Sequence, residues 1–152
     1  MVRQRDTMQY MSEGASSVQR SFRLSATTSQ LLDRRVGESG ESRNAMVDRL
    51  LNESLRLEKH PFVRFITGAA GRREPHILGT RWKVRQIIVT LKGEKGQLDS
   101  VIKGFDLTEL QVRAAVSYYA DFSDEIEAEI ERDSVDAEQQ RVRWEREQSV
   151  IG

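Results

Sequence analysis

The feature that most constrains this chain is a single stretch of alternating apolar and polar residues near its N-terminus, residues 18–24. Such alternation predicts a β-strand, because successive side chains of a strand point to opposite faces. One face carries Val18, Arg20, Phe22 and Leu24, and the other carries Gln19, Ser21 and Arg23. No second strand pattern occurs in the first sixty residues, so the predicted strand has no pairing partner in this part of the chain.

Two amphipathic helices are predicted after this strand. The first begins at the N-cap residue Ser25 and runs to about Glu38, before Gly40 ends it, and the second begins after Ser42 and runs to about Lys59. A strand and two short helices, fewer than about fifty residues, cannot bury enough apolar surface alone. We therefore expect a homodimer in which two copies of the strand pair antiparallel and the helices interlock. Their apolar residues are Leu31, Leu32 and Val36 in the first helix and Ala45, Met46, Val47, Leu50, Leu51 and Leu57 in the second.

Three segments of this region resemble the ribbon-helix-helix repressors related to MetJ, Arc and CopG. They are Phe22-Arg-Leu-Ser, then Leu31-Leu32, then Gly40-Glu-Ser-Arg-Asn-Ala-Met-Val47. The resemblance covers residues 18 to about 58, and Arg20 departs from the apolar pattern that is usual on that face. It implies a paired ribbon that enters the major groove of operator DNA.

The resemblance also implies which residues contact DNA. Gln19, Ser21 and Arg23 would read base edges, since Arg suits guanine and Gln suits adenine. Ser42 and Arg43, at the start of the second helix, would bind a phosphate through free backbone N–H groups and the positive end of the helix dipole. The alternative is a strand and two helices that serve dimerisation only.

The middle of the chain predicts a hairpin and a helix-turn-helix-like unit. Residues 62–66 and 72–78 are strand-like, and residues 67–71 form the turn; this turn lacks the GxxxxGK[ST] pattern of a phosphate loop. Helical patterns follow at 84–92, 98–103 and 108–120. Thr108 is the predicted N-cap of the last helix, with Gln111 reaching back to it. Two short helices joined by three residues are typical of a helix-turn-helix.

This region resembles a second family, the small homeodomain-like antitoxin domain known as the domain of unknown function, family 433. The matching segments are Ile77-Leu-Gly-Thr-Arg-Trp-Lys-Val84, Gln86-Ile87 and Asp106-Leu-Thr-Glu-Leu-Gln-Val-Arg-Ala-Ala-Val-Ser-Tyr-Tyr119, within residues 60–132. Together the two resemblances imply a VapB-type antitoxin of a type II toxin–antitoxin system. They also imply a cognate PIN-like ribonuclease toxin as its partner.

The second unit is not expected to read DNA through its last helix. A helix that binds a phosphate backbone should be basic, whereas residues 108–120 contain only Arg113 and also contain Glu109. Its apolar residues favour packing instead, so we interpret this helix as a packing or dimerising element. These residues are Leu110, Val112, Ala115, Val116 and Tyr119. The basic residues upstream are Arg72, Arg73, Arg81, Lys83 and Arg85. They contribute non-specific backbone contacts at most, and the alternative is a solvated face.

The C-terminal region is acidic and is predicted to bind the toxin. Residues 121–133 continue as a helix with Ile126 and Ile130 four residues apart. Residues 134–152 lack the apolar area for a core, so we expect them to order on a partner. Trp144 is the expected anchor, and Arg141, Arg143 and Arg146 are expected to contact acidic metal-binding residues of the nuclease. The alternative is a solvated helix that frays.

Charge is strongly sorted along the chain although its net value is zero. Residues 1–60 contain 10 Lys and Arg against 8 Asp and Glu, residues 61–105 contain 9 against 3, and residues 106–152 contain 5 against 13. We interpret this gradient as a sign of two partners, one anionic and one that tolerates acidic residues. The alternative is that the sorted charges pair between domains.

Composition excludes several classes of function. The chain has no Cys and two His, which removes disulfides, thiolate metal sites and a cysteine nucleophile and leaves little for a zinc site or a His triad. No apolar run is long enough for a membrane span, and the N-terminus lacks the apolar core of a secretory signal. We expect a cytoplasmic protein that is not an enzyme and has no cofactor, catalytic residue or metal.

The predicted fold class is mainly α with short β. We expect a disordered segment at 1–16, a ribbon-helix-helix dimerisation and DNA-binding domain at 17–59, a β-hairpin and helix-turn-helix-like antitoxin domain at 60–133, and a toxin-binding tail at 134–152. The predicted function is an antitoxin that inhibits its toxin and represses its own operon. The alternative is a stand-alone transcriptional regulator whose C-terminal domain senses a ligand or assembles oligomers.

Overall fold

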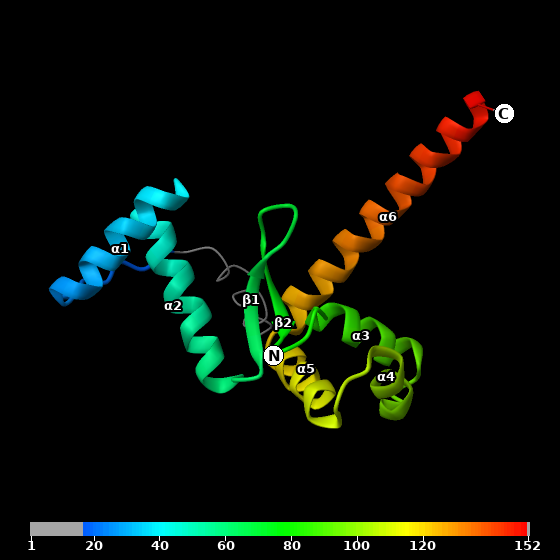
Figure 1. Cartoon of the computed structure of the whole chain (residues 1–152), viewed down its shortest axis with the longest axis horizontal. Coiled ribbons are helices and arrows are strands. Elements are labelled where there is room, and N and C mark those ends of the chain that lie inside the picture. Colours follow the sequence, from blue (N-terminus) through cyan, green and yellow to red (C-terminus); the bar gives the residue numbers. More distant parts are fainter. Residues whose placement is uncertain (1–16, 152) are drawn as a thin grey trace, which may run out of the picture. The chain divides into compact units, whose positions relative to one another are not determined.

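The computed structural model describes residues 17–151 and divides the chain into two compact units, with the boundary between Val47 and Asp48 (Figure 1). The boundary lies inside a helix, not at residues 59 and 60, where the sequence pattern changes. The described residues are mostly helical and contain one two-stranded antiparallel sheet, which confirms the predicted fold class. No helix in this range is long and apolar enough to cross a membrane. The predicted disordered segment, 1–16, lies outside the described residues.

In the first unit, residues 17–25 have no regular secondary structure in the single chain. The strand predicted there requires a second copy for its ladder, so the ribbon stays a prediction. The helix that follows, α1 (Ala26–Ser39), has the expected ends. The Ser25 side chain accepts a hydrogen bond from the backbone N–H of Thr28, and Gly40 adopts a left-handed conformation with φ 69°.

The second helix, α2 (Arg43–Lys59), crosses the boundary between the units. As predicted, Ser42 precedes it, and the Ser42 hydroxyl accepts a hydrogen bond from the backbone N–H of Ala45 at 3.2 Å. Arg56 and Lys59 lie in the last turn, where the negative end of the helix dipole stabilises their positive charges. Of the apolar residues predicted to form the stripe of this helix, Met46 is buried in the single chain.

The second unit begins with the predicted hairpin. Strands β1 (Val63–Thr67) and β2 (Arg73–Ile77) pair antiparallel, with Phe65 opposite Pro75. The connecting turn is closed by backbone hydrogen bonds from Gly68 to Arg72 and from Gly71 to Gly68, and Gly71 has φ 74°. This turn is therefore an ordinary hairpin connection, as expected.

Three helices follow where the sequence predicts helical patterns: α3 (Val84–Gly93), α4 (Leu98–Phe105) and α5 (Glu109–Asp121). Asp106 ends α4 in a left-handed conformation with φ 53°. Thr108 then caps α5 by accepting a hydrogen bond from the backbone N–H of Gln111, while the Gln111 side chain accepts one from the backbone N–H of Thr108. This is the capping box that the sequence predicts.

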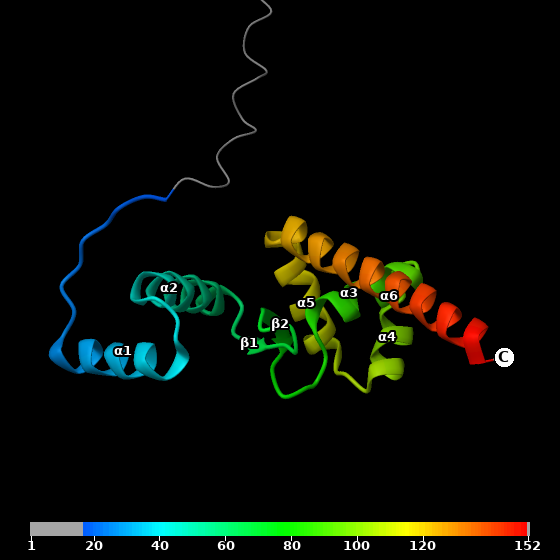
Figure 2. The same cartoon turned by 90° about the horizontal axis from the view of Figure 1, so that it is seen from above.

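The last helix, α6 (Ser123–Ile151), corrects two expectations. The chain does not continue helically from α5, because Phe122 interrupts the helix with φ −130° and ψ 39°. Residue 134, the predicted start of a separate tail, lies inside α6 with no break. The C-terminal half of α6 extends beyond the other helices of its unit in both views (Figures 1 and 2).

The hydrophobic core of the second unit lies between the hairpin and α3–α6. Tyr118 and Ile126 are fully buried in it, although sequence analysis did not single out Tyr118 and assigned Ile126 to toxin binding. Tyr119 packs against this core, as predicted. Leu110 is 56% exposed, contrary to its predicted packing role. The other buried apolar residues are Val63, Ile77, Val84, Ile87, Ile88, Val101, Leu107, Val112 and Ala115.

Candidate functional site

The predicted DNA-contacting side chains lie on the exposed segment before α1. Gln19, Ser21 and Arg23 are all exposed. The apolar residues that alternate with them are uncovered too: Val18 is 67%, Phe22 73% and Leu24 52% exposed. Three exposed apolar side chains within seven residues make this segment a candidate contact surface, because transfer of such side chains out of water is favourable.

The two residues predicted to bind a phosphate lie at the start of α2. Ser42 uses its hydroxyl to cap the helix, and Arg43 forms an ion pair with Asp33 of α1. Both members of this pair are about half exposed, so water screens the attraction and the pair is weak. A phosphate at this helix end would have to compete with Asp33 for Arg43.

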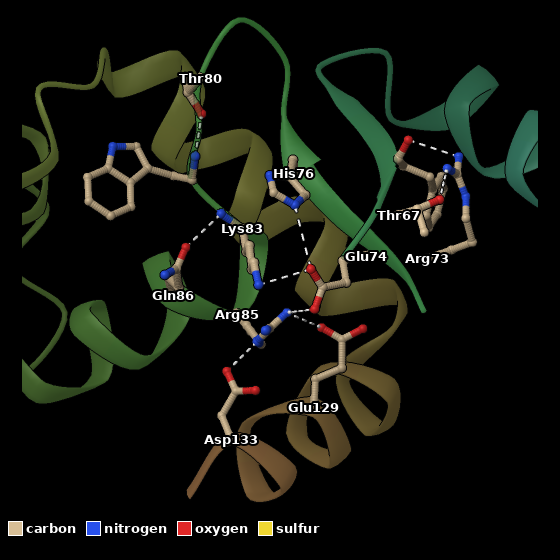
Figure 3. Close-up of polar contacts among 12 residues, drawn as sticks. Thr67, Arg73, Glu74, His76, Thr80, Lys83, Arg85, Gln86, Glu129 and Asp133 are labelled. Atoms are coloured by element: carbon tan, nitrogen blue, oxygen red, sulfur yellow. Dashed lines mark hydrogen bonds and ion pairs between the residues drawn. The ribbon is translucent and has the colours of Figure 1, made fainter. Parts of the chain in front are cut away.

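The basic cluster upstream of the last predicted helix is not a free surface, which corrects its assignment to backbone contacts. Arg85 lies with 8% of its side chain exposed and bridges β2 to α6 (Figure 3). Its guanidinium is 3.0 Å from Glu74, 3.5 Å from Glu129 and 2.5 Å from Asp133. Lys83 lies 2.9 Å from the other Glu74 oxygen. We call Glu74, Lys83, Arg85, Glu129 and Asp133 the Arg85 cluster.

Two further cations of the basic region also have partners. The Arg73 guanidinium donates two hydrogen bonds of 2.8 Å to the Glu53 carboxylate, and Arg81 stacks over the ring of Trp82 at 4.6 Å. Arg72 is exposed. Most of the basic side chains of this region are therefore engaged in contacts within the chain and do not form a free basic surface.

The ionisable groups of the Arg85 cluster have shifted pKa values. Burial opposes ionisation of Glu74, but Lys83 and Arg85 outweigh burial and lower the pKa of this carboxyl. Burial also opposes the charge of Arg85, yet Asp133 and Glu74 raise its pKa. At Glu129, burial dominates and raises the pKa of the carboxyl. The cluster thus holds α6 against β2 and α3 through a chain of opposite charges.

Other ion pairs join the basic and acidic parts of the second unit. Arg56 donates hydrogen bonds to Glu125 and to the Tyr118 hydroxyl, and His60 lies 2.8 Å from Asp121. Lys92 pairs with Glu127. Part of the charge gradient therefore reflects ion pairs inside the second unit. These pairs do not join two domains, and they are not a sign of external partners. Sequence analysis missed these contacts because they join residues 35 to 69 positions apart.

The predicted toxin-binding residues are divided between two places. Ile126 is fully buried and Ile130 packs against the core, so neither is a free partner contact, which corrects their assignment. Trp144 is 59% exposed on the extended half of α6. From Glu131 to Ile151, Val142 is the one residue that is not exposed.

The three arginines near Trp144 do not share one face of α6. At 3.6 residues per turn, Arg141 is about 60° from Trp144 around the helix axis, Arg143 about 100° and Arg146 about 160°. Arg141 pairs with Glu138 and Glu145, and Arg143 pairs with Glu147. A flat partner surface can therefore contact Trp144 together with Arg141, or Arg143 together with Arg146, but not all four.

No group of three or more His, Asp or Glu side chains within residues 17–151 is arranged to hold a metal ion. In comparisons with known proteins, no family model, no curated protein and no solved structure matches this chain.

Proposed function

We propose that this chain acts by binding, as a dimeric DNA-binding regulator of the antitoxin type. In this proposal residues 17–25 of two copies pair and present Gln19, Ser21 and Arg23 to operator DNA. The extended half of α6 binds a protein partner, a PIN-like ribonuclease toxin. The DNA-binding part rests on the alternating segment and its resemblance to ribbon-helix-helix repressors, and the toxin rests on the resemblance of residues 60–132 to antitoxin domains.

The observation that carries the proposal is the exposed alternating segment directly before two capped helices. In the single chain Val18, Phe22 and Leu24 face water. Antiparallel pairing of two such segments, with the helices packed on one side of the ribbon, would cover these three side chains and place the intervening polar ones on the opposite face. A two-stranded ribbon of this size fits the major groove of B-DNA.

The test is a gel-shift titration of the full chain on DNA from upstream of its own gene. Arg23→Ala should cost about 1–3 kcal/mol of specific affinity and relax the base preference, as expected for a base-reading arginine. The matched control is Arg34→Ala, which removes an exposed cation from α1 and should leave base preference unchanged. Operator binding that is unaffected by Arg23→Ala would refute the ribbon assignment.

A second candidate function is a stand-alone regulator whose C-terminal part assembles oligomers. The observation that favours it is the uncovered apolar surface of α6, which could equally meet another copy of the chain. Co-purification separates the two candidates: an antitoxin retains the product of the neighbouring gene through affinity and size-exclusion steps, whereas a stand-alone regulator elutes alone.

A further inference from the structure

Three buried polar atoms on one face of β2 lack a hydrogen-bond partner within residues 17–151. They are Nδ1 and Nε2 of His76 and Oε2 of Glu74. The side chains of His76 and Glu74 are 9% and 11% exposed, and Nε2 lies 3.9 Å from a Glu74 oxygen, Oε2 (Figure 3). This distance is too long for a hydrogen bond, but a small rotation of either side chain closes it. The two residues therefore form a latent ion pair, which needs a proton on His76.

Glu74 is also the carboxylate through which β2 holds the Arg85 cluster together. Its Oε1 lies 3.0 Å from the Arg85 guanidinium, and its Oε2 lies 2.9 Å from the Lys83 ammonium. Arg85 in turn contacts Glu129 and Asp133 of α6 at 3.5 and 2.5 Å. The link from β2 to α6 in this cluster therefore runs through one carboxylate, and the direction in which that carboxylate points decides whether the link is made.

The charges around this pair determine what a proton on His76 does. The charged groups are Glu74 itself, Arg64 opposite His76 on β1, Lys83 bridged to His76 before α3, and Arg85 at the start of α3. In the loop after β2, Arg81 directs its guanidinium onto the ring of Trp82. Helix α5 also packs on β2, but burial raises the pKa of its buried Tyr118 to about 12, so this group stays neutral. Among these groups Glu74 alone attracts a charged imidazole, and the cations repel it.

The proton on His76 therefore decides which partners Glu74 keeps. Burial lowers the pKa of His76, so its imidazole is neutral near neutral pH and Glu74 stays with Lys83 and Arg85. Below about pH 6.5, the ordinary pKa of histidine, an arrangement that pairs the charged imidazole with Glu74 binds an additional proton and gains population, by at most about tenfold per pH unit. Glu129 acts in the same direction, because burial raises its pKa and a protonated Glu129 no longer attracts Arg85.

We propose that His76 and Glu74 form a proton-operated switch that sets how firmly the first turns of α6 are held. With a neutral imidazole, Glu74 bridges β2 to Arg85 and so to α6. With a charged imidazole, Glu74 turns to His76 and the link between β2 and Arg85 is lost. Mild acid thus loosens the base of the helix whose second half is exposed. The switch requires neither the proposed DNA binding nor the proposed toxin.

Amide hydrogen exchange of the full chain at about pH 7.5 and about pH 5, corrected for the intrinsic exchange rate at each pH, measures this loosening. Protection of residues 126–133 in α6 should fall at least about tenfold more than protection of residues 112–118 in α5, since global unfolding would lower both equally. The nitrogen chemical shifts of the His76 ring should show it gaining its proton over the same pH range. Equal losses in the two helices, or a ring that stays neutral at the lower pH, would overturn the proposal.

Two variants identify the group that triggers the change. His76→Leu keeps an apolar side chain at this buried position and cannot titrate, so it should abolish the difference between α6 and α5. Glu129→Gln is the matched control: it removes the other buried titrating group of the cluster at nearly constant size and should keep most of the response. A response that persists in His76→Leu, or one that disappears in Glu129→Gln, would assign the trigger to another group and contradict the switch.

A third variant tests the receiving carboxylate without any change at His76. Glu74→Gln removes the charge that holds Arg85 and would attract the imidazole. Its α6 should already be less protected at neutral pH, and the difference between α6 and α5 should no longer depend on pH. Protection like that of the parent chain at both pH values would show that Glu74 does not link β2 to α6.

Discussion

At the scale of single residues, His76 on β2 has the least usual surroundings. It is 7% exposed, and neither of its ring nitrogens has a hydrogen-bond partner within residues 17–151. Figure 3 shows its contact with Glu74 of the same strand. The Glu74 carboxylate lies 3.9 Å away, and Arg64 is the cross-strand neighbour. Burial lowers the pKa of His76 most, with Lys83 and Arg64 adding to this effect and Glu74 opposing it. The folded chain therefore keeps this imidazole neutral at pH values where the unfolded chain already binds a proton.

His76 should make the fold less stable in acid. Below about pH 6.5 the unfolded state binds more protons at this residue than the folded state, so the free energy of unfolding falls as the pH is lowered. His76→Leu, which cannot titrate, should reduce this slope between about pH 6.5 and 5, by at most about 1.4 kcal/mol per pH unit. Urea unfolding at several pH values measures it. Equal slopes for the two proteins would show that His76 does not titrate differently on folding.

At the scale of elements, α6 combines two roles. Its first turns are part of the core, through Ile126, Ile130 and the contacts of Glu129 and Asp133 with Arg85. Within the described residues, the later turns of α6 add no residue to the hydrophobic core and are exposed almost throughout. A deletion that tests partner binding must therefore end after Asp133, since a cut at residue 121 would remove core residues together with the candidate partner surface.

Truncation after Ser134 should separate these roles. The shortened chain keeps the buried residues and the Arg85 cluster, so its thermal unfolding and its DNA binding should stay close to those of the full chain. It should fail to neutralise the proposed toxin when both are co-expressed, because Trp144 and the three nearby arginines are gone. Full rescue of growth by the shortened chain would place the toxin-binding surface outside the extended half of α6.

At the scale of the whole molecule, the two units differ in how much core each contains. The second unit buries Tyr118, Ile126 and nine further apolar residues, including Val63, in one cluster. In α1 no residue is buried, and Leu31 is 54% exposed. Among the described residues of the first unit, Met46 is the one buried apolar side chain. A unit with so little buried apolar surface gains stability from association, so the first unit is where we expect the dimer contact.

Phe22→Asp tests this dimer without disturbing the single chain, since Phe22 is 73% exposed there. In the chain truncated after Ser134, which lacks the extended half of α6, the parent should sediment as a dimer and the Phe22→Asp variant as a monomer. Burial of the charged side chain in the ribbon would cost more free energy than association provides. For comparison, Gln19→Asp changes the polar face and should leave the dimer intact. Equal masses for parent and Phe22→Asp would remove the basis of the ribbon.

The sequence by itself determined the local features of this protein. Ser25, Gly40 and Thr108 mark helix ends because a cap depends on backbone groups within four residues, which the sequence places directly side by side. The hairpin follows from local patterns in the same way. The strand at residues 18–24 is a local pattern whose outcome depends on a second copy, so it stays a prediction.

The tertiary structure decided what depends on contacts between distant residues. It closed Arg85 into a cluster with Glu74 and Glu129, and it turned Ile126 from a candidate partner contact into core. It also placed a helix break at Phe122, and α6 continues without interruption past residue 134, where a separate tail was predicted. Neither periodicity nor composition contains these facts, because the free energy of a buried charge or side chain is set by the residues that surround it in space.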